Sequence, residues 1–232
     1  MIGYFNYTEV LTYLSLISAS FGIVISLNGT GHPYLGVFFL MFSGLCDAFD
    51  GKVARMKKDR SEREKKFGIQ IDSLSDLVAF GVLPGCIGNA LIRVNPGLYE
   101  SPFKGEKRFD WVVTCVMFAI IVLYILAALI RLAYFNVMEE ERQKTEEGTR
   151  KSYVGLPVTS SALIFPTIML IQYATPKIDL TWLYFGVMFL VSYLFLAKIN
   201  IRKPGLTGIL IMVAIGLAEA VALMLCNFFL AK

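Results

Sequence analysis

Residues 47–76 read DAFDGKVARMKKDRSEREKKFGIQIDSLSD, and the rest of the chain is best understood from this stretch. Four of its aspartates, Asp47, Asp50, Asp72 and Asp76, flank a segment rich in lysine and arginine. Apolar stretches long enough to span a bilayer lie on both sides. Because a carboxylate at membrane depth costs roughly 3 kcal/mol on insertion scales, the aspartates indicate function.

The spacing of the aspartates predicts a metal site. Asp47 and Asp50 are three residues apart, and Asp72 and Asp76 are four apart, so on helices each pair projects from one face. Four carboxylates that converge from two helices cannot all stay ionised without a cation between them. Mg²⁺ and Mn²⁺, which prefer carboxylate and water oxygens, fit such a site.

Small residues beside the aspartates predict a groove for a larger ligand. Gly51 and Ala54 continue the face of Asp47 at one and two turns, and Gly68 lies one turn before Asp72. These positions leave the backbone open to close approach. Arg55 adds a planar guanidinium suited to phosphate.

The stretch resembles the signature of the CDP-alcohol phosphatidyltransferases, D-x2-D-G-x2-A-R followed by G-x3-D-x3-D, and all eight fixed positions are present. The usual spacer is about eight residues, and residues 56–67 make twelve here. Because the additional residues are mostly charged, we expect about one more helical turn on the cytosolic side.

Three further stretches resemble the phosphatidylserine synthase branch of this family: IDSLSDLVAFGVLP, RLAYFN at 131–136 and YVGLP at 153–157. Tyr134 stands where that branch usually has arginine, so Arg131 or Lys151 would have to take its role. The resemblance implies transfer of the phosphatidyl group of CDP-diacylglycerol to L-serine with two divalent ions, Mg²⁺ or Mn²⁺. It also implies a homodimer.

The resemblance also implies roles for the residues. Asp47, Asp50 and Asp72 would bind the ions, while Asp76 would share a metal and take the proton of the serine hydroxyl. The CDP-diacylglycerol site would be formed by Thr12, Ser15, Asp50, Gly51, Ala54, Arg55 and Gly68. Candidates for binding the acceptor or a phosphate are Arg131, Asn136, Lys151, Arg202 and Lys203.

Several of these residues have simpler interpretations. The hydroxyls of Thr12 and Ser15 could bond their own helix backbone. Arg131 could extend to the membrane interface, and Asn136 could cap its helix. Arg202 and Lys203 could serve only to orient the chain in the membrane.

Composition favours one polytopic membrane domain over residues 1–232. The chain is 56% hydrophobic with a mean hydropathy of +0.63. The net charge of +4 comes from a few clusters, which fits anionic lipid headgroups and not nucleic acid. The four cysteines are isolated in apolar segments, so neither disulfides nor a zinc site is indicated.

Hydropathy and turn signals predict an all-α bundle of about seven transmembrane helices. The expected spans are residues 8–27, 34–56, 68–92, 110–137, one that begins near Pro157, 180–198 and 206–230. Segments 52–67, 138–152 and 198–204 hold 8, 4 and 3 lysines and arginines, whereas the opposite side holds 6. The positive-inside rule therefore predicts a multi-pass protein of the cytoplasmic membrane with its acidic site facing the cytosol.

Two alternatives stay open from the sequence. The acceptor could be glycerol 3-phosphate or an inositol phosphate, which would demand a dedicated basic cluster beside the metals. A divalent-cation transporter could also place carboxylates within helices, but it would not need the groove of Gly51, Ala54 and Arg55.

Overall fold

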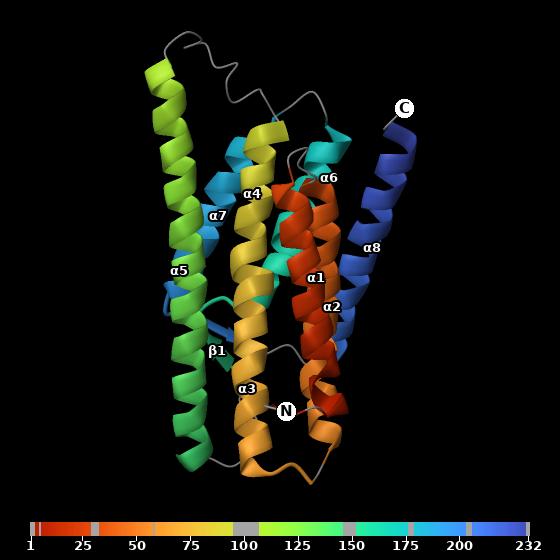
Figure 1. Ribbon diagram of the computed structural model, residues 1–232, viewed down its shortest axis with the longest axis vertical. Coiled ribbons are helices and arrows are strands. Elements are labelled where there is room, and N and C mark those ends of the chain that lie inside the picture. Colours follow the sequence, from red (N-terminus) through yellow and green to blue (C-terminus); the bar gives the residue numbers. More distant parts are fainter. Residues whose placement is uncertain are drawn as a thin grey trace.

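The computed structural model describes residues 3, 4, 6–28, 33–57, 59–94, 107–145, 152–175, 179–202 and 206–230. They form a bundle of roughly parallel helices, with α5 and α8 on its two flanks and the continuous run of α3 and α4 between them (Figure 1). The α-helices are α1 (Val10–Leu27), α2 (Pro33–Met56), α3 (Glu62–Asp76), α4 (Leu83–Val94), α5 (Lys107–Thr145), α6 (Ser161–Ala174), α7 (Thr181–Leu196) and α8 (Leu206–Leu230). The shorter elements are η1 (Tyr7–Glu9), η2 (Leu77–Val82), η4 (Val158–Ser160), β1 (Ser152–Val154) and β2 (Asn200–Arg202).

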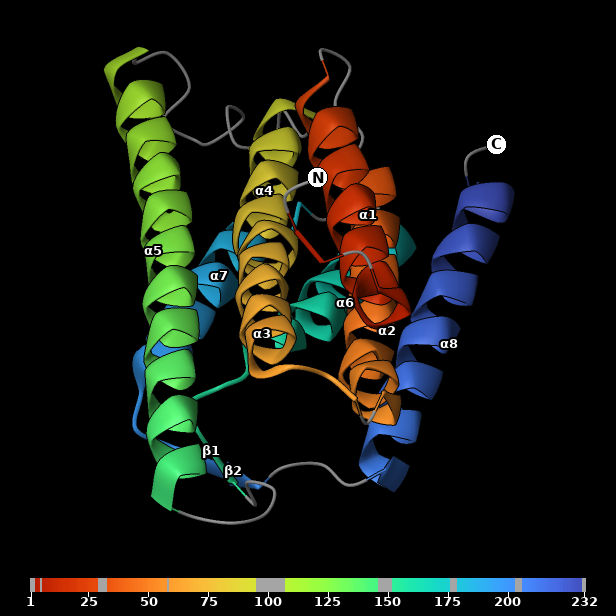
Figure 2. The same ribbon diagram turned by 60° about the horizontal axis from the view of Figure 1, so that its bottom comes forward.

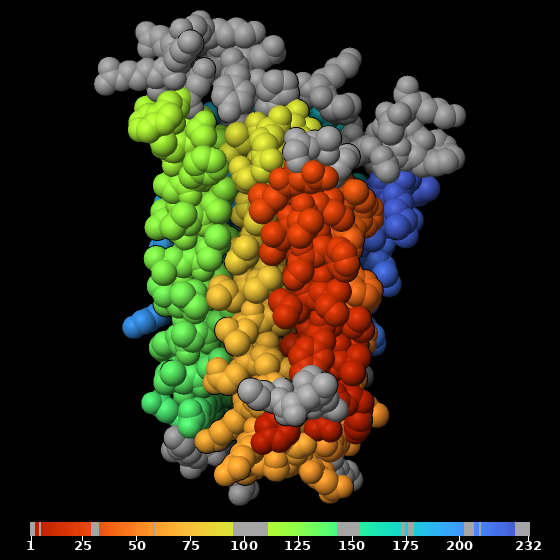
Figure 3. Space-filling view, viewed as in Figure 1, coloured from red at the N-terminus to blue at the C-terminus, as the bar shows by residue number. Residues whose placement is uncertain are grey.

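The prediction of an all-α polytopic membrane bundle is confirmed. Within the described residues, four helical stretches are long and apolar enough to cross a bilayer: Tyr7–Leu27, Pro33–Met56, Glu62–Val94 and Trp111–Arg142. Three shorter apolar helices, Val158–Gln172, Thr181–Leu196 and Leu210–Leu225, coincide with the other expected spans. α1 and α5 form much of one face of the bundle (Figure 3). Many of their apolar side chains are exposed, as a lipid-facing surface requires.

Hydroxyl groups join the first two helices closely. Ser18 donates a hydrogen bond to the carbonyl of Phe39 at 2.8 Å, and Ser43 donates one to the carbonyl of Ser15 at 3.0 Å. Small residues allow such backbone approach where hydrophobic association is weak. α1 and α2 thereby form a rigid pair that carries the first acidic motif.

One helix contains a π turn immediately after the second acidic motif. η2 is a π-helix, and at its end the backbone N–H of Leu83 bonds the carbonyl of Val78, five residues back. Pro84 follows directly, and it has no N–H with which to bond the carbonyl of Phe80. Proline thus gives a local reason for the irregularity.

The YVGLP stretch forms a feature that the sequence did not predict, a short β ribbon. β1 pairs with β2 in antiparallel register, with Tyr153 opposite Ile201. Gly155 has φ +79°, and an added Cβ would lie 2.8 Å from the carbonyl oxygen of Phe195, so glycine is required. The ribbon lies at the same end of the bundle as the α2–α3 connection (Figure 2).

Candidate metal and substrate site

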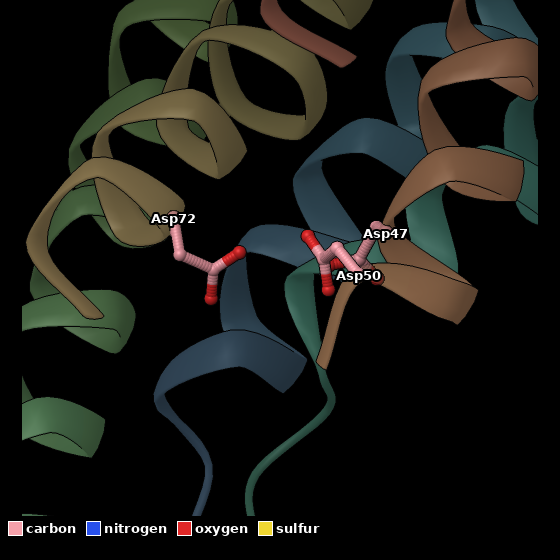
Figure 4. A group of neighbouring side chains, drawn as sticks. All are labelled: Asp47, Asp50 and Asp72. Carbon is pink, nitrogen blue, oxygen red and sulfur yellow. The ribbon is translucent and has the colours of Figure 1, made fainter. Parts of the chain in front are cut away.

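The two acidic motifs meet between α2 and α3. Asp47 and Asp50 lie near the end of α2, and Asp72 projects toward them from α3 (Figure 4). Carboxylate oxygens of these three residues all lie within 4.8 Å of one another. The helical spacing read from the sequence thus corresponds to a real cluster.

Asp76 completes the cluster from one turn further along α3. It is buried, with 9% of its surface exposed, and its carboxyl group lies close to that of Asp47. Asp50 and Asp72 make a similar contact. The hydroxyl of Thr12, on α1, donates to Asp50 at 3.4 Å, so three helices contribute to the site.

The donor set fits a divalent cation. Among the described residues, the ion pairs involve none of the four aspartates. Carboxylates that are crowded together repel one another when ionised, and only oxygen ligands are present in the cluster. Hard cations such as Mg²⁺ and Mn²⁺ match that chemistry.

A cavity of about 1190 Å³ extends from the aspartates into the bundle. Its polar end contains all four aspartates together with Lys52, Arg55 and Arg131. The rest is lined mainly by apolar side chains, including Phe38, Phe42, Leu163, Met212 and Leu217 from α2, α6 and α8. A ligand that fills it would need an anionic end and a long apolar body.

Gly51 and Arg55 also line this cavity. The nearest atoms that a Cβ at Gly51 would meet belong to the Arg55 guanidinium, at 3.6 Å. The backbone at Gly51 is therefore open to a ligand, and Arg55 lies over it. Ala54 is half-buried and does not line the cavity.

Among the acceptor-site candidates whose side chains the structure describes, Arg131 lines the cavity. It is buried, its Nε donates to the carbonyl of Leu156 at 3.3 Å, and its guanidinium lies 5.3 Å from the centre of the Phe135 ring. Tyr134, at the position of the missing arginine, is half-exposed and does not line the cavity. Asn136 instead donates to the hydroxyl of Ser73 at 2.8 Å, which joins α5 to α3.

Two other predicted residues have different surroundings. The hydroxyl of Ser15 donates to the carbonyl of Ser43 at 3.4 Å, and Ser15 does not line the cavity. A Cβ at Gly68 would lie 2.5 Å from the guanidinium of Arg60, so Arg60 covers its open face. Lys151 and Lys203 lie outside the described residues, as does the side chain of Arg202.

Sequence reasoning missed a second group of charges at the α2–α3 connection. Arg60 pairs with the buried carboxylate of Glu9 at 2.7 Å, and Glu64 pairs with Lys57 at 3.2 Å. Ser61 and Glu64 form a capping box that begins α3 six residues before Gly68. The S-x-x-E pattern was readable in the sequence, but the contact between Glu9 and Arg60 spans 51 residues and was not.

Comparison with known proteins agrees with this geometry. The sequence model of the CDP-alcohol phosphatidyltransferase family matches residues 5–217. A Saccharomyces cerevisiae protein named CDP-diacylglycerol--serine O-phosphatidyltransferase is 32% identical over 171 residues, which cover 71% of this chain and 54% of that protein. A Helicobacter pylori protein of the same name is 28% identical over 172 residues, which cover 73% of this chain and 60% of that protein.

A Methanocaldococcus jannaschii protein with that name is 26% identical over 157 residues, which cover 68% of this chain and 57% of the relative. The chain thus spans little more than half the length of these relatives. No solved structure matches. The family match covers both acidic motifs and most of the bundle that holds them together, so this chain belongs to the CDP-alcohol phosphatidyltransferase family.

Proposed function

We propose that this chain transfers the phosphatidyl group of CDP-diacylglycerol to L-serine and releases CMP. The observation that carries the proposal is a cavity that has both an acidic, oxygen-rich end and an apolar body. A diphosphate bound through divalent cations at the aspartates would leave the acyl chains in the apolar part. A transported cation alone would have no use for that apolar volume.

The chemistry is an in-line displacement at phosphorus. The serine hydroxyl oxygen forms a bond to the phosphorus that carries the diacylglycerol, and the bond from that phosphorus to the CMP oxygen breaks. Two divalent ions, when bound, would neutralise the diphosphate and stabilise the leaving oxygen. Asp47, Asp50 and Asp72 would hold them, and Asp76 would share a metal and accept the hydroxyl proton.

Other residues of the site would orient the substrate. Thr12 fixes Asp50 through its hydrogen bond, and Arg55 is exposed above Gly51, where a phosphate could approach. Ser15, Ala54 and Gly68 stay predictions from the family resemblance, and they would act through the shape of the helices. CMP would leave toward the polar end of the cavity, since the other end is apolar.

Serine as the acceptor is supported by the names of the relatives and by the basic group available. Arg131 is a fixed, buried guanidinium at the cavity, which suits one carboxylate. A phosphorylated acceptor such as glycerol 3-phosphate would need further basic groups for its phosphate, in addition to those that face the diphosphate of CDP-diacylglycerol. Lys151, Asn136, Arg202 and Lys203 stay predictions for this role.

We further propose that the site faces the cytosol of a cell whose cytoplasmic membrane holds the chain. The α2–α3 connection, the end of α5 and the β ribbon all lie at one end of the bundle (Figure 2). These are the places near which the sequence concentrates lysine and arginine. The homodimer implied by the family resemblance stays a prediction.

The test is an acceptor panel on the purified, detergent-solubilised chain. CDP-diacylglycerol and Mn²⁺ are supplied with L-serine, glycerol 3-phosphate, an inositol phosphate or no alcohol, and both CMP and the lipid product are measured. We expect CMP release and phosphatidylserine only with serine. Release with a phosphorylated acceptor and not with serine would contradict the assignment, and release without any alcohol would indicate hydrolysis.

A further inference from the structure

The π turn η2 separates two parts of one continuous helix that have different tasks. α3, before the turn, carries Asp72 and Asp76, and α4, after it, packs in the apolar core through Leu83 and Ile87. A π turn accommodates one residue more than an α turn, so it rotates the two parts relative to each other by about 100°. The direction in which the aspartates project thus depends on this turn.

Pro84 leaves one backbone carbonyl of the turn without its usual donor. In a regular helix the carbonyl of Phe80 would accept from the N–H of residue 84, but residue 84 is proline. Phe80 is fully buried, and a buried carbonyl must be bonded by some other group.

Tyr124 of α5 supplies that donor. Its side chain is fully buried, and its hydroxyl donates to the carbonyl of Phe80 at 2.7 Å. Since a tyrosine hydroxyl has a single hydrogen, the contact of 2.7 Å with Ser161 must be a bond that Ser161 donates. Ser161 begins α6, so three segments of the chain meet at this one carbonyl.

We propose that Tyr124 is a positioning residue for the acidic cluster. Its hydroxyl stabilises the π form of η2, and the π form sets the rotation of α3 that directs Asp72 and Asp76 toward Asp47 and Asp50. The inference rests on the proposed function, because it concerns the alignment of metal ligands. It assigns a catalytic consequence to a hydrogen bond inside the apolar core.

Tyr184 of α7 provides a matched control, because its acceptor lies in the same continuous helix as Phe80. It too is fully buried, and its hydroxyl donates to the carbonyl of Pro84 at 2.8 Å. Its acceptor is four residues beyond Phe80 and belongs to α4, on the far side of the turn from the aspartates. Phenylalanine at either position removes one hydroxyl and leaves the ring packing in place.

The experiment compares Tyr124→Phe and Tyr184→Phe with the parent chain, each as the full chain in detergent. Mn²⁺ binding is measured by electron paramagnetic resonance, alongside thermal unfolding and serine-dependent CMP release. Loss of support behind metal ligands commonly weakens affinity by about 10- to 100-fold, and we expect a weakening of this order for Tyr124→Phe. For Tyr184→Phe we expect Mn²⁺ affinity within about twofold of the parent, with a similar fall in melting temperature.

Equal Mn²⁺ affinity in all three proteins, or equal weakening in both variants, would overturn the positioning role of Tyr124. If the parent chain is active in that case, the proposed function still stands. A parent that binds no Mn²⁺ and releases no CMP would instead remove the proposed function, and the inference with it. Ser161→Ala adds a graded case: it keeps the Tyr124 bond to Phe80, so its effect on Mn²⁺ should be smaller than that of Tyr124→Phe. A larger effect on Mn²⁺ affinity would contradict the role of Tyr124 and indicate that Ser161 positions the aspartates.

Discussion

Two groups of charged side chains lie near the same end of the bundle and differ in one respect. At the α2–α3 connection two carboxylates form ion pairs: Glu9 with Arg60 at 2.7 Å, and Glu64 with Lys57 at 3.2 Å. The aspartate cluster has no such partner among the described ion pairs. The paired carboxylates are neutralised by their partners, whereas crowded buried carboxylates need a cation to stay ionised. We therefore expect the first group to serve structure and the second to serve chemistry.

The sharpest test of this comparison is to remove one carboxylate charge from the aspartate cluster. Asp47→Asn or Asp72→Asn should abolish CMP release and Mn²⁺ binding, because a metal ligand is lost, while the protein still inserts and folds. Activity, Mn²⁺ binding and the melting temperature are measured together. Parental turnover in excess chelator would contradict the metal site altogether.

A smaller but still large effect on transfer is expected from replacing Asp76, the proposed general base. Asp76→Asn should keep binding of CDP-diacylglycerol and Mn²⁺, yet lose transfer by roughly two to four orders of magnitude, the usual range for a general base. Substrate binding and serine-dependent CMP release are compared on the same preparation. Release within about tenfold of the parent would leave Asp76 as a metal ligand or bystander, with the proton passing to water.

The groove next to the cluster can be filled without touching the carboxylates. Gly51→Leu should weaken binding of CDP by about tenfold or more, because the leucine side chain would fill space that the nucleotide is expected to occupy. Overfilling a packed site costs about 1–3 kcal/mol. The Mn²⁺ affinity should change less. Gly186→Leu is the control, because an added Cβ there meets no atom within 4 Å. Calorimetry with CDP on the Mn²⁺-loaded proteins makes the comparison. Unchanged CDP affinity in Gly51→Leu would mean that the nucleotide binds elsewhere.

The paired group should show the opposite behaviour and the smallest effect on chemistry. Arg60→Gln leaves the carboxylate of Glu9 buried without its partner, which typically costs about 3–5 kcal/mol of stability, but Mn²⁺ affinity should stay near that of the parent. Lys65→Gln breaks an exposed pair with Glu62 and should leave the melting temperature unchanged. Partial recovery of stability in Glu9→Gln/Arg60→Gln would confirm that the pair is structural. Loss of Mn²⁺ binding in Arg60→Gln would contradict a purely structural role for the pair.

Much of the site was readable in the sequence because it is local. The i, i+3 and i, i+4 spacing placed each aspartate pair on one helix face, and the apolar runs placed both helices in a membrane. The sequence also predicted about one more helical turn from the longer spacer at 56–67. In the structure, residues Glu62–Phe67 of the spacer are helical and precede Gly68. Each of these features depends on neighbours within a few turns of helix.

What the sequence alone determined, then, is the set of clustered aspartates, the helical class and the membrane character, because helix periodicity and hydrophobicity act over short stretches. Only the tertiary structure decided which residues join them. It brought Arg131 to the cavity, placed Arg60 over Gly68, and set Tyr124 against the carbonyl that Pro84 leaves without a donor. These contacts join residues at least eight positions apart, and in the case of Tyr124 and Phe80 44 apart, so their formation depends on how the whole bundle packs.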